Sequence, residues 1–295
     1  MNQQINTHQF NNKNLNIHEC NHTCGVCELK KILFFHKKIR NSFFPILINW
    51  LFEVNLEVHS LDKKSILNNL NFSYSMLKPF EVTIKLFQEY MLKTEKKITK
   101  ANLQLVGVSC YSIALQEIYP DKKTYQLSEE ECSDYTNNSY SPKNVCDTIL
   151  HIKETVKKIF FPSITNSINI LLQKERKTIN DSDYDLLKIF TYYFFSLSLN
   201  DLSLLKIDTK YLSERIINSA KYINNKESIL ISNEKIDNIL DNRIIKLYYN
   251  TLVSNRNRNY LVLNSMIVKY YLYFMDKYVS QSKGSSKKIK KILFL

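Results

Sequence analysis

Three cysteines and two histidines lie close together near the start of the sequence. In HECNHTCGVC, Cys20, Cys24 and Cys27 follow a C-x3-C-x2-C spacing, with His18 and His22 alongside. Three thiolates at this spacing can bind an iron–sulfur cluster of the kind used by radical S-adenosylmethionine enzymes. Thiolates combined with an imidazole can instead bind zinc. Free thiols in a polar arm are the third interpretation, and the elements that follow the cluster decide among them.

Glycine is scarce in the rest of the chain. The 295 residues include three glycines and five prolines. Barrels, sandwiches and doubly wound sheets need many tight turns, which favour glycine. The sequence contains neither of the glycine-rich loops that bind phosphate groups. This composition predicts an all-α protein. It disfavours the iron–sulfur interpretation, because a radical enzyme needs a barrel of strands behind the cysteines. A zinc clip made by Cys20, Cys24, Cys27 and His22 stays open, as do free thiols.

The chain is basic, with 41 Lys and Arg against 28 Asp and Glu. A net charge of +13 favours acidic partners. Lys, Asn and Ile are heavily used throughout, however, and an A/T-rich genome gives the same bias. We favour that explanation over nucleic-acid binding. No apolar run reaches the length of a membrane span, and the N-terminus lacks the pattern of a signal peptide. We therefore expect no membrane association and an intracellular protein, in the nucleus or the cytoplasm. KKIKK near the C-terminus is compatible with nuclear import.

Apolar residues recur at helical spacing along most of the chain. A basic helix is expected over 28–39. In the first half, helices are expected in FFPILINWLFEV, EVTIKLFQEYMLK, NLQLVGVSCYSIALQEIYP and SPKNVCDTILHIKETVKKIFF. The third of these is apolar nearly all round, which predicts a helix at the centre of a bundle. In the second half, helices are expected over 164–173, 183–199, 209–223, 235–253 and 260–279.

Two segments of the first half lack helical periodicity. We predict a loop with a helical piece over 62–79 and a surface loop for DKKTYQLSEEECSDYTNNSY. The acidic run SEEECSD resembles paired catalytic carboxylates, but a solvated loop explains it better. The six histidines are scattered, and none lies beside a nucleophile in a recognisable arrangement. The sequence therefore predicts a protein without a catalytic set.

Three of these segments resemble the cyclin box. FFPILINWLFEV is similar to its opening helix, M-R-x-I-L-x-D-W-L-x-E-V. LQLVGVSCYSIALQEIYP resembles its central helix, L-Q-L-V-G-x-x-x-x-x-I-A-S-K-x-E-E-I-Y-P. YTNNSYSPKNV resembles the entry to its fifth helix, I-T-D-x-x-Y-T-x-x-x-V. In the second half, SLSLNDLSLLKIDTKYLSERIINSAKYI looks like part of a cyclin's second fold. The resemblance covers residues 40 to 280, most specifically in the first half.

The resemblance implies two tandem five-helix cyclin folds with a short N-terminal arm, as in A- and B-type cyclins. The implied units are 1–38 (arm), 39–162 (first box), 163–282 (second fold) and 283–295 (basic tail). It also implies a non-catalytic regulatory subunit that activates a cyclin-dependent protein kinase in cell-cycle control. The implied kinase contacts are Gln116, Glu117, Lys143, Ile149 and Ile152. The implied docking patch for R-x-L substrate or inhibitor motifs is Phe43, Leu47 and Trp50, although the same residues can simply fill the core.

The chain departs from the family at positions that matter for partner binding. In the family, an Arg of the opening helix pairs with an acidic residue of the second helix. The position of that Arg is Phe44 here, and the Asp position of the opening helix is Asn49. Glu89 with Arg40 is the pair that could take over. The Lys that contacts the kinase falls on Gln116, and its Glu partner falls near Ile149. We therefore expect either a divergent kinase partner, which we favour, or a cyclin fold that no longer activates a kinase.

One alternative comes from another family of cyclin-fold proteins. The general transcription factor IIB family also combines an N-terminal metal ribbon with two cyclin folds, and it binds DNA. A ribbon needs two separated pairs of ligands with strands between them, whereas the ligands here are crowded into HECNHTCGVC. The alternative function is thus a transcription or nucleic-acid-binding factor that does not activate a kinase.

Overall fold

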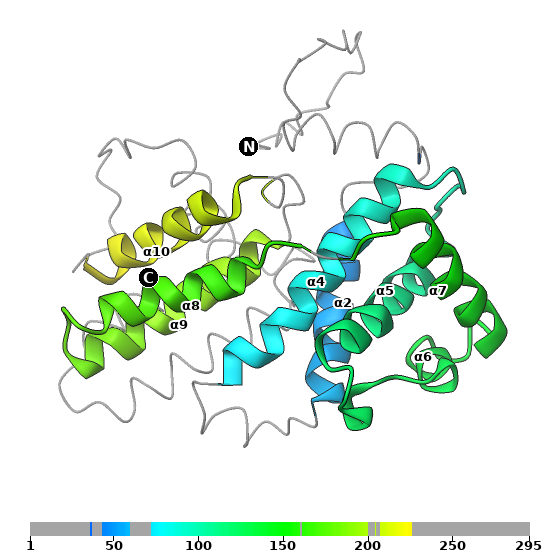
Figure 1. Cartoon of the computed structure of the whole chain (residues 1–295), viewed down its shortest axis with the longest axis horizontal. Coiled ribbons are helices and arrows are strands. Elements are labelled where there is room, and N and C mark those ends of the chain that lie inside the picture. The colour runs from blue at the N-terminus through cyan, green and yellow to red at the C-terminus, as the bar shows by residue number, and fades with distance from the viewer. Residues whose placement is uncertain are drawn as a thin grey trace, which may run out of the picture.

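The computed structural model describes residues 36, 43–59, 72–159, 161–199, 204 and 207–225. These residues form helices and no strand, so the all-α prediction is confirmed for this part of the chain (Figure 1). The helices are α2 (Phe43–Val58), α4 (Phe72–Lys93), α5 (Leu103–Ile118), α6 (Glu129–Tyr135), α7 (Pro142–Val156), α8 (Ile164–Glu175), α9 (Asp181–Ser198) and α10 (Thr209–Asn225), with a 3-10 turn η1 (Lys123–Tyr125).

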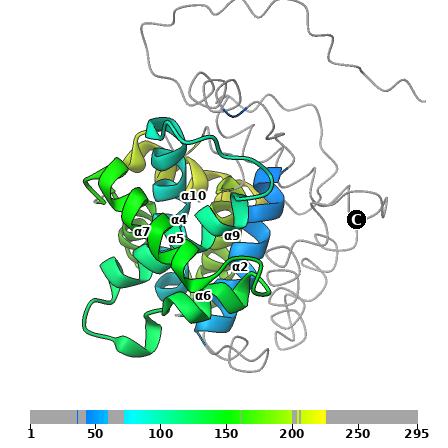
Figure 2. The ribbon, with the colours of Figure 1, turned by 90° about the vertical axis from the view of Figure 1, so that its right-hand side faces the viewer.

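Helix α5 is the central helix of the first half, as predicted. It packs against α2, α4, α6 and α7, and every residue from Val106 to Leu115 is buried. Gly107 allows the close approach of α2, because a Cβ at this position would lie 3.0 Å from the Leu47 Cδ1. Figure 2 shows α5, α6 and α7 together on the side of the molecule that faces the viewer. The helices of the first half are therefore organised around the segment LQLVGVSCYSIALQEI.

Helix α4 begins earlier than the sequence indicates. The helical piece predicted within 62–79 is its last part, which is continuous with the next helix: α4 starts at Phe72 and continues through Pro79, whereas the sequence indicated a helix in EVTIKLFQEYMLK. Proline normally interrupts a helix by removing a hydrogen bond. Here Met76, Leu77 and Phe80 are fully buried, so packing holds the segment helical around the missing bond. Residues 60–71 lie outside the described part.

Helix α6 lies where a surface loop was predicted. Ser128 and Glu131 form a capping box: the Ser128 hydroxyl accepts from the Glu131 N–H, and the Glu131 carboxylate accepts from the Ser128 N–H. This reciprocal cap stabilises a helix start. Cys132 and Ser133 are buried beneath it. The acidic run is thus the first turn of a short helix, and the Ser-x-x-Glu spacing was the signal for it.

The second half contributes α8, α9 and α10, close to the predicted 164–173, 183–199 and 209–223. Ser163 and Asn180 cap α8 and α9. Each side chain accepts from the N–H group of the third residue of its helix, Asn166 and Asp183 respectively. Helix α9 buries a continuous aromatic segment, Tyr192 to Phe195, and α10 packs against both α8 and α9. The predicted helices over 28–39, 235–253 and 260–279 lie outside the described residues, apart from His36.

Helix α7 ends in a turn with unusual backbone geometry. Lys157 has φ 59° and ψ −41°, and the Lys158 N–H donates to the Val156 carbonyl at 2.6 Å. This is a tight three-residue turn with a non-glycine residue at positive φ. Such a conformation stores of the order of 1 kcal/mol or more of strain.

Replacing Lys157 with glycine should therefore stabilise the protein. We expect the free energy of unfolding to rise by about 1 kcal/mol, because glycine adopts positive φ without strain. Urea denaturation of wild type and variant measures the change. Lys158→Gly is the matched control, since its φ is not positive and glycine there should destabilise. Equal destabilisation by both variants would contradict the prediction.

Candidate partner-binding surfaces

One candidate surface lies where the C-terminal half of α5 meets α7. The Lys153 ammonium of α7 donates to the Gln116 Oε1 of α5 at 3.0 Å, at the surface of the molecule. Glu117 and Lys143 are also exposed. Ile149 and Ile152, by contrast, are core residues on the buried face of α7. Of the implied kinase contacts, the structure therefore places Gln116, Glu117 and Lys143 where a partner can touch them, and places the two isoleucines beneath them.

An exposed leucine occupies the outer face of α7. Leu150 is 54% exposed, a large fraction for an aliphatic side chain in a capped helix. Lys143, Asp147 and Glu154 are exposed as well, and they lie on the same face at intervals of three and four residues. We call Gln116, Leu150 and Lys153 the α5–α7 surface. Leu150 and Lys153 were not singled out from the sequence, where an isolated leucine in an amphipathic helix is read as core.

The implied docking patch on α2 is only partly at the surface. Leu47 is buried against Gly107, so it fills the core. Phe43 and Trp50 are partly buried, and the Lys100 ammonium lies 5.4 Å from the centre of the Phe43 ring. Ile46 is 44% exposed. Phe43, Ile46 and Trp50 recur at i, i+3 and i+7, so the apolar stripe on α2 passes through Ile46 rather than Leu47.

The departures from the cyclin pattern have a packing explanation. Phe44, at the position of the family's Arg, is buried and meets Phe87 of α4 in an edge-on contact with 6.2 Å between ring centres. Asn49, at the position of the Asp, donates to Glu53 within α2. An aromatic contact therefore joins α2 to α4 where the resemblance implied an ion pair. Glu89 forms an ion pair with Lys93 at 3.4 Å, and Arg40 lies outside the described residues.

A buried carboxylate in α4 joins the two halves of the chain. Glu81, 1% exposed, accepts from the Lys85 ammonium at 2.7 Å, within α4. The same carboxylate accepts from the Ile164 N–H (2.7 Å), the Thr165 N–H (3.0 Å) and hydroxyl (2.5 Å), and the Ser163 hydroxyl (3.2 Å). A carboxylate is well placed at a helix N-terminus, where N–H groups lack partners. Glu81 therefore caps α8 from inside the first half.

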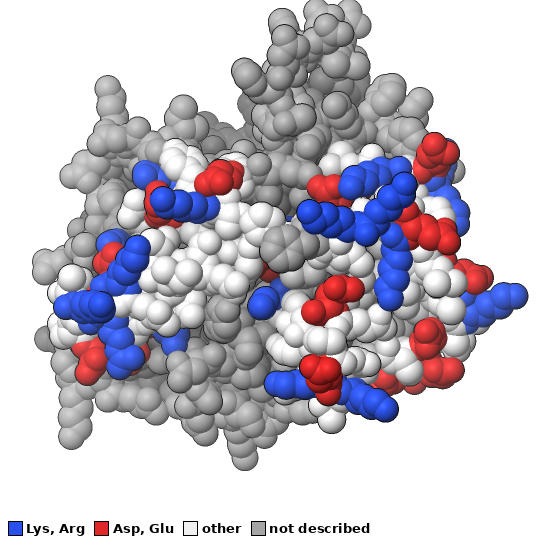
Figure 3. All heavy atoms as spheres, viewed as in Figure 1, with Lys and Arg blue, Asp and Glu red and all other residues white. Residues whose placement is uncertain are grey.

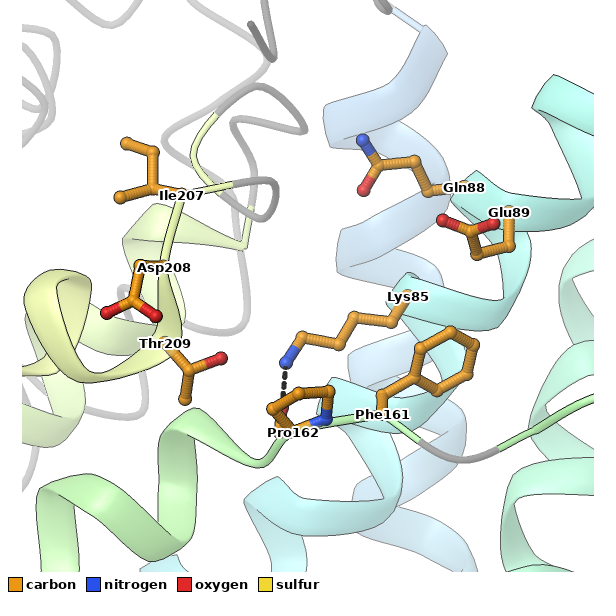
Figure 4. Close-up of a pocket in the computed structure, with 8 residues that line it drawn as sticks. All are labelled: Lys85, Gln88, Glu89, Phe161, Pro162, Ile207, Asp208 and Thr209. Atoms are coloured by element: carbon orange, nitrogen blue, oxygen red, sulfur yellow. Dashed lines mark hydrogen bonds between the residues drawn. The ribbon is translucent and has the colours of Figure 1, made fainter. Parts of the chain in front are cut away.

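A cavity of about 300 Å³ lies beside this junction. Lys85 reaches across it and donates to the Pro162 carbonyl at 2.5 Å, as Figure 4 shows. Phe161 and Ile207 give it apolar walls, and Asp208 lies opposite Lys85. The Asp208 carboxylate also accepts from the Tyr211 N–H at the start of α10. The polar groups that line the cavity are therefore already bonded: Lys85 to the segment just before α8, and Asp208 to the start of α10.

The described histidines act as structural groups. His36 is fully buried: its Nε2–H donates to the Met91 carbonyl at 3.0 Å, and its Nδ1 accepts from the Ile98 N–H at 3.1 Å. His36 therefore bonds both to the C-terminal end of α4 and to the loop between α4 and α5. His59 bonds to the Asn55 carbonyl, and burial lowers its pKa. These bonds account for two histidines that seemed scattered in the sequence.

Three further described groups have shifted pKa values. His151 bonds to the Tyr90 hydroxyl at 3.0 Å, and partial burial lowers its pKa. Burial raises the pKa of the Cys110 thiol well above its usual range and that of Cys132 to about 12. These thiols stay protonated, so they are poor nucleophiles and poor metal ligands.

No group of ligating side chains in the described ranges is arranged to hold a metal ion. The predicted zinc ligands Cys20, Cys24, Cys27 and His22 lie outside those ranges. On the face drawn in Figure 3, basic and acidic side chains of the described residues are interspersed rather than gathered by sign. Among the described helices, none is both long and apolar enough to cross a membrane.

No family model matches the chain, and no curated protein matches it. The exposed surfaces of the described helices are therefore the features from which a function can be inferred.

Proposed function

We propose that this chain is a divergent cyclin-like regulatory subunit that binds and activates a cyclin-dependent protein kinase, without catalytic residues of its own. One observation carries the proposal. The segment that resembles the central helix of the cyclin box is α5, from Leu103 to Ile118, and α5 is the buried centre of the first half.

The other two motifs support the same reading. The segment that resembles the opening helix is α2, which packs on α5. The segment that resembles the entry to the fifth helix leads into α7, where Ser141 forms the cap and Pro142 the first turn. Among the described residues of the first half, α2, α4, α5, α6 and α7 follow one another, which is compatible with the five helices of a cyclin box. We propose α8 to α10 as the beginning of the second fold.

The proposed mechanism is a rigid contact. The α5–α7 surface would press against the regulatory helix of the kinase and hold its Lys–Glu ion pair and activation segment in the active arrangement. A regulator that shifts an equilibrium must bind one state better than the other. The capped α7 and the fully packed α5 suit this role, because a surface of fixed shape can match the active state of the kinase helix and not the inactive one.

The test is co-purification from extracts of the source cells. We expect the tagged full-length chain to capture a protein kinase, identified by mass spectrometry, and to raise its phosphorylation rate about tenfold or more. The kinase alone and the tag alone are the controls. Capture of no kinase, or of a kinase whose rate is unchanged, would overturn the proposal.

The alternative function has its own readout. The net charge of +13 is compatible with a nucleic-acid-binding factor. Such a factor would bind duplex DNA with an affinity that falls steeply as salt increases. DNA binding without kinase activation would favour the alternative.

A further inference from the structure

We infer that Lys153 and Leu150 form the contact pair of the α5–α7 surface, and that the partner's helix presents a carboxylate to Lys153 beside an apolar side chain that covers Leu150. The inference rests on the proposed function and adds the chemistry of the partner.

The first step is the state of Lys153. Its one described bond is to the Gln116 Oε1, and it joins a side chain of α7 to a side chain of α5 at the surface. Gln116 is neutral, so it orients the ammonium without neutralising its charge. An ammonium has three N–H donors, and this bond uses one of them. Lys153 is therefore a positioned cation with donors left for a partner.

The second step is the neighbourhood of Lys153. Leu150 lies three residues earlier on α7, so the two side chains are neighbours on the helix surface. Over residues 76–159, no other large hydrophobic side chain is as exposed as Leu150. Leu150 and Lys153 thus place an apolar side chain beside an oriented charge. A partner helix can match this pair with one apolar and one acidic residue that lie one turn apart.

The third step is the sign of the charge. A carboxylate opposite Lys153 would make a charge-assisted hydrogen bond. Asp147 and Glu154 flank Leu150 on the exposed face of α7. They would repel an acidic residue of the partner placed opposite either of them, whereas Lys153 would attract one, so the position of the carboxylate along the partner helix matters. The surface thus distinguishes among kinases by where their regulatory helix carries its carboxylate.

Gln116→Glu is the sharpest variant, because it leaves every atom position nearly unchanged. The new carboxylate would form an ion pair with Lys153 and neutralise its charge. We expect the captured kinase to bind about tenfold more weakly, while thermal unfolding stays the same or shifts slightly upward. Lys153→Gln should weaken binding by a similar factor.

Leu150→Asp tests the apolar half of the pair, and Ile170→Asp is its matched control. Ile170 is 56% exposed on α8, so both variants place a carboxylate at an equally exposed aliphatic position. We expect Leu150→Asp to abolish capture and Ile170→Asp to leave it within about twofold of wild type. Circular dichroism melts confirm that each variant is folded.

The outcomes separate the two proposals. If wild type captures and activates a kinase but the three variants bind it as well as wild type does, the contact pair is wrong and the proposed function stands. The inference would also be contradicted if Ile170→Asp weakened kinase binding as much as Leu150→Asp does. If wild type captures no kinase, both the proposed function and this inference are wrong.

Discussion

Replacing Glu81 with alanine is expected to lower the free energy of unfolding by about 3–5 kcal/mol. The carboxylate is 1% exposed and accepts hydrogen bonds from four groups of residues 163–165 as well as from Lys85. Its loss would leave the Lys85 charge buried without its partner and the N–H groups at the start of α8 without an acceptor. The start of α8 would lose its hydrogen bonds to the Glu81 carboxylate of α4.

Glu175→Ala is the matched control for Glu81→Ala. Glu175 and Lys221 form an ion pair of the same length, 2.7 Å, but their side chains are 25% and 38% exposed, against 1% and 8% for Glu81 and Lys85. An exposed pair of this kind contributes less than about 1 kcal/mol. Urea denaturation followed by circular dichroism measures both variants. A loss below about 1 kcal/mol for Glu81→Ala would show that the junction does not depend on the carboxylate.

The sequence predicted those features of the fold that depend on periodicity. The apolar pattern of LQLVGVSCYSIALQEI predicted a central helix, and α5 is buried almost throughout. Ser141 and Pro142 predicted the start of α7 because a hydroxyl cap followed by proline has a local physical meaning. Helical spacing of apolar residues also predicts the helices over 164–173, 183–199 and 209–223, where α8, α9 and α10 lie.

Features that depend on contacts between distant segments were not predictable in this way. Glu81 and Lys85 are charged residues four apart, which on a helix normally indicates a solvated face. Their burial follows from α8 starting directly against them, a fact of tertiary structure. Likewise, nothing local to Lys153 shows that Gln116, on another helix, lies within hydrogen-bonding distance. The resemblance named Gln116 on α5, whereas Leu150 and Lys153 on α7 were identified from the structure.

Replacing Asn55 with leucine is expected to cost about 2–4 kcal/mol, although the two side chains have similar volumes. Asn55 is fully buried between α2, α4 and α5. Its Oδ1 accepts from the Tyr111 hydroxyl at 2.9 Å, and its Nδ2 donates to the Met76 carbonyl at 3.2 Å. Leucine would leave the Tyr111 hydroxyl buried without its acceptor and would remove the bond to the Met76 carbonyl.

A double-mutant cycle tests whether this network, and not packing, is the cause. Tyr111→Phe alone should cost about 1–2 kcal/mol, because it leaves the Asn55 Oδ1 without a donor. In the double variant the unpaired hydroxyl is gone, so the combined loss should fall about 1–2 kcal/mol short of the sum of the single losses. Tyr111→Phe combined with Glu175→Ala is the control, and its effects should add within about 0.5 kcal/mol. Additivity in the Asn55–Tyr111 cycle would mean that the hydrogen bond contributes little. The three central helices would then be held together by apolar contacts, and the position of α5 beneath the α5–α7 surface would not depend on a polar network.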